Sequence, residues 1–350
     1  MTADKLVRPE VLGMAAYHVA DAAGMVKLDA MENPYLLPEP LRRGLAQVLA
    51  GVALNRYPEP NSPRLCELIR RKMAVPQGME ILLGNGSDEL IQLLAIALAR
   101  DGASMMYPAP TFVVYSMSAL FMRMRAVPVA LRDDFSLDAD RFIARMREEK
   151  PALVFLAYPN NPTGVLYPEA DVVRIIEAAP GLVVLDEAYH VFAGKTFMGA
   201  LPKYRNLVVL RTVSKLGLAG IRLGYLAGHP AWVGELNKVR PPYNVSVLTE
   251  AAAMFMLEHL DVLEAQAAEI RAERAKLHGA LSALKGATVF PSAANFFLLR
   301  VPDAVRTYEA LRQQRVLVRN LHPGLANCVR VTVGTPDENR ILLNALKEAL

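Results

Sequence analysis

Cysteine, tryptophan and long apolar runs are scarce in this sequence of 350 residues. Its only cysteines, Cys66 and Cys328, lie far apart and outside any metal-ligand spacing, so we predict free thiols, a reducing compartment and no metal site. The longest apolar stretches, such as residues 90–99, are about half of the roughly 20 residues that span a bilayer. Charged side chains precede any apolar run at the N-terminus, so no signal peptide is visible. We therefore predict a soluble, cytoplasmic protein without a membrane segment.

The chain also has no block of like charge. Its 39 basic and 35 acidic residues leave a formal net charge of +4 that is spread along the sequence. This balance slightly favours small anionic ligands and gives hardly any support to nucleic-acid binding. Hydrophobic residues make up 53% of the chain, which is rich for a monomer, so a buried subunit interface is expected.

Apolar runs alternate with helical patterns between residues 80 and 230. The runs that resemble buried strands are residues 80–84, 103–107, 124–131, 152–158, 182–187, 206–212 and 222–228. Such alternation is typical of an α/β domain with a mostly parallel sheet flanked by helices. In that architecture, ligands bind at the carboxyl ends of the strands.

The rest of the chain has a different pattern. Residues 250–285 predict one or two long helices, and the short strands and helices after them predict a smaller α+β unit. We predict an N-terminal arm at residues 1–40 that contributes to the small domain or to dimer contacts. A large domain at 41–250 and a small C-terminal domain at 251–350 complete the expected organisation.

Two polar motifs follow predicted strands. In GNGSDELI (84–91), glycines allow a tight turn and Ser87 and Asp88 begin a helix, which forms either an ordinary capped turn or an anion site. In YPNNPTG (158–164), two prolines restrict the backbone around Asn160 and Asn161. Amides can serve a simple turn, but the rarity of the full heptapeptide favours binding of a ligand oxygen.

A carboxylate and an amine also follow predicted strands. Asp186 comes directly after four apolar residues, where a charge is costly unless it meets a cation. Lys215, in TVSKLGLAGIRLGY (212–225), has apolar flanks and precedes Arg222 by seven positions. Burial beside that arginine would disfavour the ammonium form, and a free amine is the nucleophile that a Schiff base requires. Because the carboxyl ends of parallel strands share one edge, we expect Lys215, Asp186 and Asn161 to meet there.

These groups together match the needs of pyridoxal 5′-phosphate. A carboxylate keeps a pyridine nitrogen protonated and makes the ring an electron sink, while the amine binds its aldehyde carbon. Arg222, Ser214, Thr212 and the helix start at Ser87 suit a phosphate dianion. We therefore predict pyridoxal 5′-phosphate as the cofactor.

The motifs also resemble those of the fold-type I aminotransferases that depend on this cofactor. The matching motifs are NPTG, DEAY, SK and Arg-x-Gly-Tyr. Further stretches resemble the histidinol-phosphate aminotransferase branch, namely LDAMENPY, LNRYPEP, GNGSDELI, SAANFFLLR and VRVTVGTPDEN. The resemblance spans almost the whole chain and implies the fold-type I architecture in a homodimer with shared active sites.

The resemblance also implies a role for each matching residue. Lys215 would form the Schiff base and move the proton, Asp186 would pair with the pyridine nitrogen, and Asn161 and Tyr189 would contact the phenolic oxygen. The remaining implied cofactor contacts are Phe112 on the ring face and, at the phosphate, Ser87, Asp88, Thr212, Ser214, Arg222 and Tyr57 of the neighbouring subunit. Arg330 would bind the substrate's carboxylate, and the candidates for the amino-donor pocket are Tyr17, Tyr243, Asn295 and Arg319.

The sequence departs from the family pattern at three places. The segment between Lys215 and Arg222 is one residue shorter than usual. Met31 stands where the arm usually has asparagine, and Phe112 replaces a more common tyrosine, which removes a hydroxyl but keeps the stacking face.

The implied reaction is transamination between L-histidinol phosphate and 2-oxoglutarate, which gives imidazole-acetol phosphate and L-glutamate in histidine biosynthesis. An aromatic-amino-acid aminotransferase or a phospho-amino-acid decarboxylase on the same fold is the alternative. A catalytically silent binding protein is a third interpretation, but the joint presence of Lys215, Asp186 and Arg222 argues against it.

Overall fold

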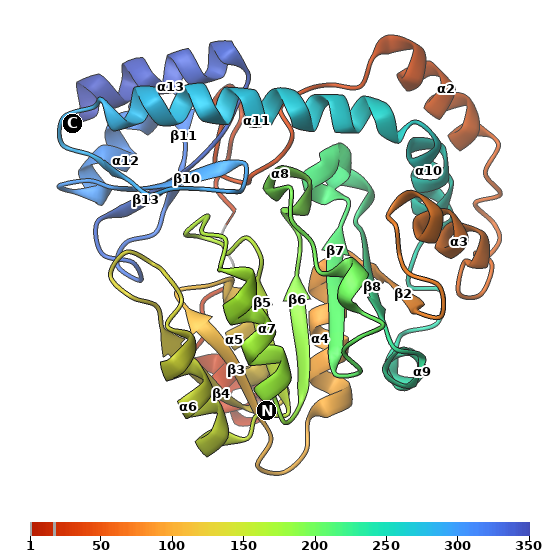
Figure 1. The fold of residues 1–350 in the computed structure, drawn as a ribbon. Helices are drawn as coiled ribbons and strands as arrows, with labels where there is room; N and C mark the ends of the chain where they lie inside the picture. Colours follow the sequence, from red (N-terminus) through yellow and green to blue (C-terminus); the bar gives the residue numbers. More distant parts are fainter. Residues whose placement is uncertain (1, 17–18) are drawn as a thin grey trace.

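A central sheet of seven strands organises the protein, which a computed structural model describes for residues 2–16 and 19–350 (Figure 1). The strands, in chain order, are β2 (Glu80–Asn85), β3 (Ser104–Ala109), β4 (Arg125–Ala130), β5 (Leu153–Ala157), β6 (Leu182–Asp186), β7 (Leu207–Thr212) and β8 (Leu223–Gly228). Their spatial order is β2-β8-β7-β6-β5-β3-β4, and only β8 runs antiparallel to its neighbours. The predicted α/β class with a mostly parallel sheet is therefore confirmed.

Helices cover both faces of this sheet because successive side chains along each strand point to two different apolar cores. In β5, Leu153 and Phe155 join the core under one set of helices, whereas Val154 and Leu156 join the core under the other. The helices of the first set are α4 (Ser87–Leu98), α5 (Val113–Phe121) and α9 (Pro230–Val239). Those of the second are α3 (Pro63–Lys72), α6 (Ala139–Glu149), α7 (Glu169–Ala178) and α10 (Val247–Glu258). Strands that are apolar on both faces are typical of a sheet buried between helix layers.

A second, antiparallel sheet lies toward the C-terminus, with the order β12-β13-β10-β9. Its strands are β9 (Thr288–Val289), β10 (Phe296–Arg300), β12 (Arg319–Asn320) and β13 (Cys328–Thr332). The helices beside it are α11 (Leu260–Ser282), α12 (Ala304–Gln313) and α13 (Pro336–Ala349), and α11 extends from this sheet across to α10 (Figure 1).

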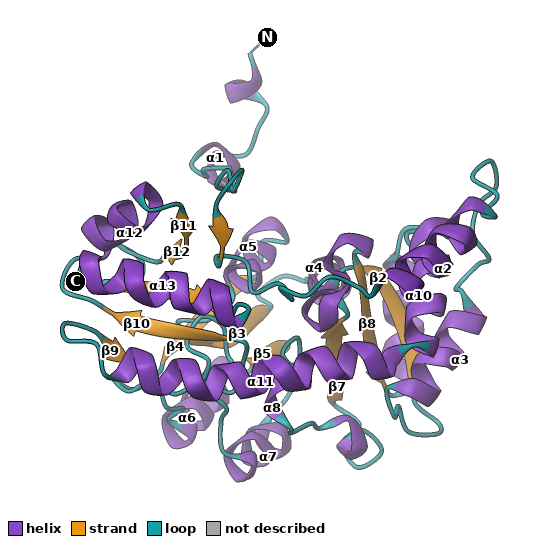
Figure 2. Ribbon diagram, turned by 90° about the horizontal axis from the view of Figure 1, so that it is seen from above, coloured by secondary structure: helices purple, strands orange, loops and turns teal. Residues whose placement is uncertain are grey.

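The N-terminal part of the chain reaches the second sheet before it enters the large one. Strand β1 (Val26–Lys27) pairs in parallel with β11 (Val316–Leu317) in a separate two-stranded sheet, and the Thr332 amide of β13 donates to the Leu28 carbonyl. The chain then passes to α2 (Glu39–Ala50), which packs on α10. Ahead of β1, the short helix α1 (Pro9–Leu12) projects away from the body of the protein (Figure 2).

A buried ion pair fixes β6 to β7 next to the sheet edge that carries the predicted site. The Arg211 guanidinium donates to Oε2 of Glu187 from Nε at 2.9 Å and from Nη2 at 2.8 Å. Thr196 and the Phe197 amide also donate to the Glu187 carboxylate, which is fully buried. Because each group of the pair has hydrogen-bond partners, the pair is compatible with this apolar environment.

The remaining short elements include α8 (His190–Ala193) and 3-10 turns at Ala3–Lys5, Met198–Ala200 and Ala219–Ile221. Among the residues that the structure describes, none of the helices is both long and apolar enough to cross a membrane.

Candidate active site

One cavity of about 120 Å³ lies at the edge of the large sheet where β5, β6 and β7 end. The residues that line it are Met31, Ser87, Asp88, Phe112, Tyr115, Ala157, Pro159, Asn161, Asp186, Ala188, Tyr189, Thr212, Ser214, Lys215 and Arg222. Because β8 is antiparallel, its first residues reach the same edge as the ends of the other strands, which brings Arg222 to the cavity. Lys215, Asp186 and Asn161 thus meet around one space.

Lys215 follows β7 and lies near the start of the irregular segment that returns to β8. Its Nζ donates to the Ala30 carbonyl at 2.9 Å and lies 5.9 Å from the centre of the Tyr189 ring. Burial lowers the pKa of this amine to about 8, and the Arg330 charge adds to the lowering more than the Arg222 charge does. The sequence pointed to Arg222 as the neighbouring cation, so Arg330 is the contribution that it missed. About a tenth of the amine is therefore neutral, and nucleophilic, at pH 7, far more than for a lysine with the ordinary pKa.

Asp186 ends β6 inside the cavity wall, with 5% of its surface exposed. Its Oδ2 accepts a hydrogen bond from the Tyr115 hydroxyl at 2.6 Å, and its Oδ1 accepts one from the Ala188 amide at 3.1 Å. Burial raises the pKa of the carboxyl to about 6, although both hydrogen bonds act in the opposite direction. At neutral pH the group is a buried carboxylate that a nearby cation or protonated ring nitrogen would stabilise.

Tyr115 is a site residue that the sequence analysis did not identify. It lies three residues after Phe112, on α5, and its side chain is fully buried. Its ring stacks on Phe155 with 4.4 Å between centres and meets the Phe112 ring edge-on at 5.8 Å. The only sequence signal was this helical spacing behind an aromatic residue, which equally fits a simple core position.

A polar corner of the cavity forms where α4 begins beside Arg222. The guanidinium Nη2 lies 3.4 Å from Oδ2 of Asp88, and the Thr212 hydroxyl donates to the Ser214 oxygen at 2.8 Å. Free N–H groups and the dipole at a helix N-terminus attract anions, and hydroxyl and guanidinium groups do the same. The arrangement fits a phosphate group.

Two glycines allow this close approach of helix, strand and arginine. A Cβ at Gly86 would lie 2.6 Å from Nη2 of Arg222, and a Cβ at Gly224 would lie 2.6 Å from the Ser87 nitrogen. Gly86 also has a φ of +80°, which side-chain-bearing residues rarely adopt. Any larger residue at either position would push the helix start and Arg222 apart.

The shortened segment between Lys215 and Arg222 takes a tight path. Residues Ser214–Leu218 form a π-helical turn in which Gly217 has a φ of +127°, and a 3-10 turn follows at Ala219–Ile221. Arg222 itself is left-handed, with a φ of +52°, and this reversal aims the chain into β8.

The lining also includes Phe112, Asn161, Tyr189 and Met31. Oδ1 of Asn161 accepts a hydrogen bond from Nη1 of Arg330 at 2.5 Å. The Tyr189 hydroxyl donates to the Met31 sulfur at 3.1 Å. Met31 has a φ of +56°, a conformation in which asparagine is several-fold more frequent than methionine, so this backbone is held by its contacts with the second sheet.

Of the predicted substrate residues that the structure describes, none lines the cavity, but Arg330 and Asn295 contact residues that do. Arg330, on β13, is buried, donates to the Asp29 carbonyl at 2.8 Å and lies over the Phe296 ring. Arg319 is its cross-strand partner on β12, and Asn295 donates to the Met31 carbonyl at 3.1 Å. Tyr57 and Tyr243 stack on each other away from this cavity, at 4.6 Å between ring centres. Tyr17 lies outside the residues that the structure describes.

The donor set fits the predicted cofactor. A flat aromatic ring could lie beside Phe112 with its nitrogen toward the Asp186 carboxylate, its aldehyde carbon toward the Lys215 amine, and a phosphate at the polar corner. Asn161 and Tyr189 also line the cavity and could contact a ring oxygen.

Comparison with known proteins gives a consistent result. A family model described as "Aminotransferase class I and II" matches residues 23–346. The chain is 58% identical to histidinol-phosphate aminotransferase 1 of Ralstonia nicotianae, over 99% of this chain and 95% of that protein. It is 55% identical to histidinol-phosphate aminotransferase of Chromobacterium violaceum, over 99% and 98% of the two chains. The crystal structure of histidinol-phosphate aminotransferase from Sinorhizobium meliloti, in complex with pyridoxal-5′-phosphate, superposes with a TM-score of 0.87 at 24% identity, covering 98% of this chain and 97% of that one.

Proposed function

The chain belongs to the class I and II aminotransferases, in the family of histidinol-phosphate aminotransferases, and we propose that it catalyses the reaction for which that family is named. It transfers the amino group of L-histidinol phosphate to 2-oxoglutarate, which yields imidazole-acetol phosphate and L-glutamate in histidine biosynthesis. The observation that carries the proposal is that Lys215, Asp186 and the residues of the polar corner line the same cavity.

The cofactor is pyridoxal 5′-phosphate, which when bound supplies an electron sink for the carbanion formed at the substrate's Cα. Asp186 holds a proton on the ring nitrogen, and Phe112 covers a ring face. Asn161 and Tyr189 contact the ring oxygen. The phosphate is held by the α4 start at Ser87 and Asp88, together with Thr212, Ser214 and Arg222.

Lys215 and Arg330 act on the substrate. The neutral Nζ of Lys215 takes the proton from the substrate's Cα and later returns a proton, because an amine with a pKa of about 8 can do both near neutral pH. Arg330 binds the carboxylate of glutamate and 2-oxoglutarate, since its planar fork pairs with an anion through two hydrogen bonds. Asn295, Arg319, Tyr243 and Tyr17 contribute to the amino-donor pocket.

A homodimer completes the site in this proposal. Leu36, Leu54 and Tyr57 are 81%, 70% and 80% exposed, and Tyr243 and Leu248 are also exposed, which is expected where a second copy would cover them. Tyr57 then reaches the cofactor phosphate of the neighbouring subunit. We assign residues 1–40 to an arm, 41–250 to the large domain and 251–350 to the small domain, and we propose a cytoplasmic location.

A direct assay tests the substrate. Purified protein with pyridoxal 5′-phosphate and 2-oxoglutarate should form glutamate rapidly from L-histidinol phosphate and much more slowly from phenylalanine or threonine phosphate. Faster turnover of phenylalanine would make it an aromatic-amino-acid aminotransferase, and carbon dioxide release from threonine phosphate would make it a decarboxylase. Lys215→Ala should abolish turnover while the cofactor still binds non-covalently, and near-normal turnover of that variant would refute the proposed role of the lysine.

A further inference from the structure

Two exposed aromatic side chains form a pair outside the cavity. Tyr57 and Tyr243 are 80% and 44% exposed, yet their rings stack at an interplanar angle of 17°. They belong to loops far apart in the sequence, one before α3 and the other between α9 and α10. Exposed rings on separate loops keep one orientation only if the loops themselves are fixed.

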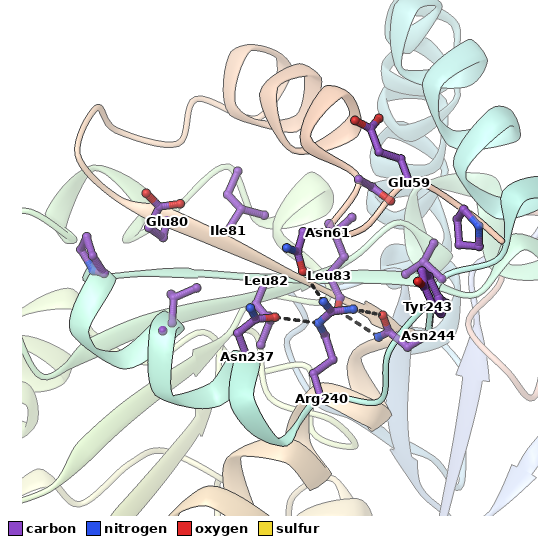
Figure 3. Close-up of a pocket in the computed structure, with 16 residues that line it drawn as sticks. Glu59, Asn61, Glu80, Ile81, Leu82, Leu83, Asn237, Arg240, Tyr243 and Asn244 are labelled. Carbon is purple, nitrogen blue, oxygen red and sulfur yellow. Dashed lines mark hydrogen bonds between the residues drawn. The ribbon is translucent and has the colours of Figure 1, made fainter.

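Arg240, the residue directly after α9, connects both loops. Its guanidinium donates from Nη2 to Oδ1 of Asn61, from Nη1 to Oδ1 of Asn244 at 2.5 Å, and from Nε to Oδ1 of Asn237 at 2.9 Å. Figure 3 shows these contacts, with the Arg240 side chain pointing between the amides. Asn61 lies four residues after Tyr57, and Asn244 directly follows Tyr243. We call this group of contacts the Arg240 clamp.

The clamp is anchored to the rigid part of the large domain. Nδ2 of Asn244 donates to Oε2 of Glu89 at 2.6 Å and to the Leu83 carbonyl at 3.2 Å. The same Glu89 oxygen accepts the Asn85 amide at 2.7 Å, so the carboxylate is fixed between β2 and the first turn of α4. Asn244 is thus hydrogen-bonded to the sheet and to α4, Arg240 is bonded to Asn244, and the loop of Tyr57 is bonded to Arg240.

The backbone of both loops requires such support. Asn61, Ser62 and Tyr243 have φ values of +62°, +43° and +56°. Left-handed conformations are uncommon for residues other than glycine, and for serine and tyrosine they persist where surrounding contacts hold them. The contacts lie at the edge of a second cavity, of about 270 Å³, which Arg240, Asn61, Asn237, Tyr243 and Asn244 help to line (Figure 3).

The arginine geometry explains why one residue can hold both loops. A guanidinium presents several N–H donors in a fixed plane, and here three of them point to three different amide oxygens. In the part of the chain that the structure describes, no carboxylate forms an ion pair with Arg240. Its contacts are thus directional hydrogen bonds to neutral groups, which define position more than they neutralise charge.

We propose that Arg240 is a positioning residue: it clamps the loops of Tyr57 and Tyr243 in the orientation in which they complete the active site of the second subunit. This inference rests on the proposed homodimer, in which Tyr57 contacts the neighbouring cofactor phosphate. Arg240 thereby acts across the subunit interface without touching substrate or cofactor.

Mixed dimers test this directly, because they separate an effect on the same subunit from an effect on the partner. Arg240→Gln homodimers should bind pyridoxal 5′-phosphate about ten- to a hundredfold more weakly, the loss expected for one hydrogen bond to a charged group. In a dimer of one Arg240→Gln subunit and one Lys215→Ala subunit, the only site with a lysine receives Tyr57 from the subunit whose Arg240 is intact. That site should bind and retain cofactor as the unaltered protein does, as measured by borohydride trapping and mass analysis of the Arg240→Gln subunit.

Three further variants serve as a second test and as controls. Asn61→Ala removes one contact of the clamp and should give a smaller effect with the same rescue in mixed dimers, which keeps the test valid if Arg240→Gln folds poorly. Lys238→Gln removes an exposed charge from α9, where Lys238 contacts Glu235, and should leave cofactor affinity unchanged. Arg240→Lys keeps the charge but not the fork, and it should bind cofactor nearly as weakly as Arg240→Gln.

Each alternative outcome has one meaning. Cofactor affinity of the mixed site as weak as in Arg240→Gln homodimers would show action within the subunit and overturn the inference, as would unaltered affinity in the homodimers. If the mixed dimers showed the expected cofactor binding but the unaltered protein formed no glutamate from histidinol phosphate, only the proposed substrate would be wrong.

Discussion

The phenolic oxygen of Tyr115 lies 2.6 Å from Oδ2 of Asp186 and donates a hydrogen bond to that carboxylate. The contact joins α5 to the end of β6 beneath the cavity. Because the Tyr115 ring also meets Phe112, one buried side chain supports both the carboxylate that we propose for the cofactor nitrogen and the ring that we propose for the cofactor face.

Replacing Tyr115 by phenylalanine tests the importance of this hydrogen bond. The hydroxyl favours the charged form of Asp186, so its removal should raise the pKa of that carboxyl above about 6. We expect kcat to fall by about tenfold or more, and the acidic limb of the pH profile to move to higher pH. The phenyl ring retains the stacking on Phe155, so thermal stability serves as the control for packing. An unaltered pH profile would contradict this role.

Asp186→Asn should make the cofactor-free protein more stable and the enzyme with cofactor less active. The pKa of Asp186 is about 6 in the folded protein and 3.8 as its ordinary value, so the folded state binds more protons between these values. This group therefore lowers the free energy of unfolding as pH rises from about 4 to 6, and the full penalty remains at pH 7. The amide should increase stability at pH 7 by up to about 3 kcal/mol and have little such effect below pH 4.

Urea unfolding at the two pH values measures this difference, and glutamate formation should fall by about a hundredfold or more in the same variant. Equal stabilisation at pH 4 and pH 7 would indicate that the carboxylate charge is not its cause.

Arg330 should influence both substrate binding and the Lys215 amine. Arg330→Gln removes the cation that lowers the pKa of Lys215, so that pKa should rise above about 8. The rate of acylation of Lys215 in the cofactor-free protein, followed against pH by peptide mapping, reports this shift. KM for glutamate should rise by about ten- to a hundredfold as the paired hydrogen bonds to the carboxylate are lost.

Arg330→Lys is the matched variant, because it keeps the charge and loses the planar fork. It should preserve the low pKa of Lys215 but raise KM for glutamate. Should both variants shift the pKa of Lys215 equally, the charge of Arg330 is not its cause.

The buried pair of Glu187 and Arg211 should be a determinant of stability. Glu187→Gln leaves the buried Arg211 charge without its counterion, which typically costs about 3–5 kcal/mol. Replacing both residues, as Glu187→Leu with Arg211→Met, should recover a large part of that loss. Urea unfolding measures each change, with the exposed Glu235→Gln as a control that should alter stability by less than about 1 kcal/mol. A loss below 1 kcal/mol in Glu187→Gln would contradict the importance of the pair.

The sequence predicted the sheet and its class well because the pattern that forms it is local. Apolar runs such as Leu182–Asp186 end in a polar residue where the strand ends, so both the strand and its functional end are visible in one short stretch. The sequence predicted one or two long helices at residues 250–285 but not where one ends and the next begins. The break falls at His259, where the ring Nδ1 contacts the Phe255 carbonyl.

Contacts between distant segments could not be predicted in the same way. Tyr115 and Asp186 are 71 positions apart, and nothing near either residue indicates the other. The resemblance marked Met31 as a departure from the family pattern, but its contact with the Tyr189 hydroxyl depends on how the arm packs on the second sheet. Cavity residues at strand ends were therefore accessible to sequence reasoning, whereas their supporting neighbours were not.

The short strand β1 lies close in sequence to a carbonyl group that contacts the amine of Lys215. Val26 and Lys27 pair with β11, and only a few residues later the Ala30 carbonyl accepts a hydrogen bond from the Lys215 amine. A rigid-body shift of β11 and β13, to which this segment is hydrogen-bonded, would move the Ala30 carbonyl relative to the Lys215 nitrogen. Trimming the protein past residue 30 would consequently remove a strand from one part of the molecule and an acceptor from another in a single cut.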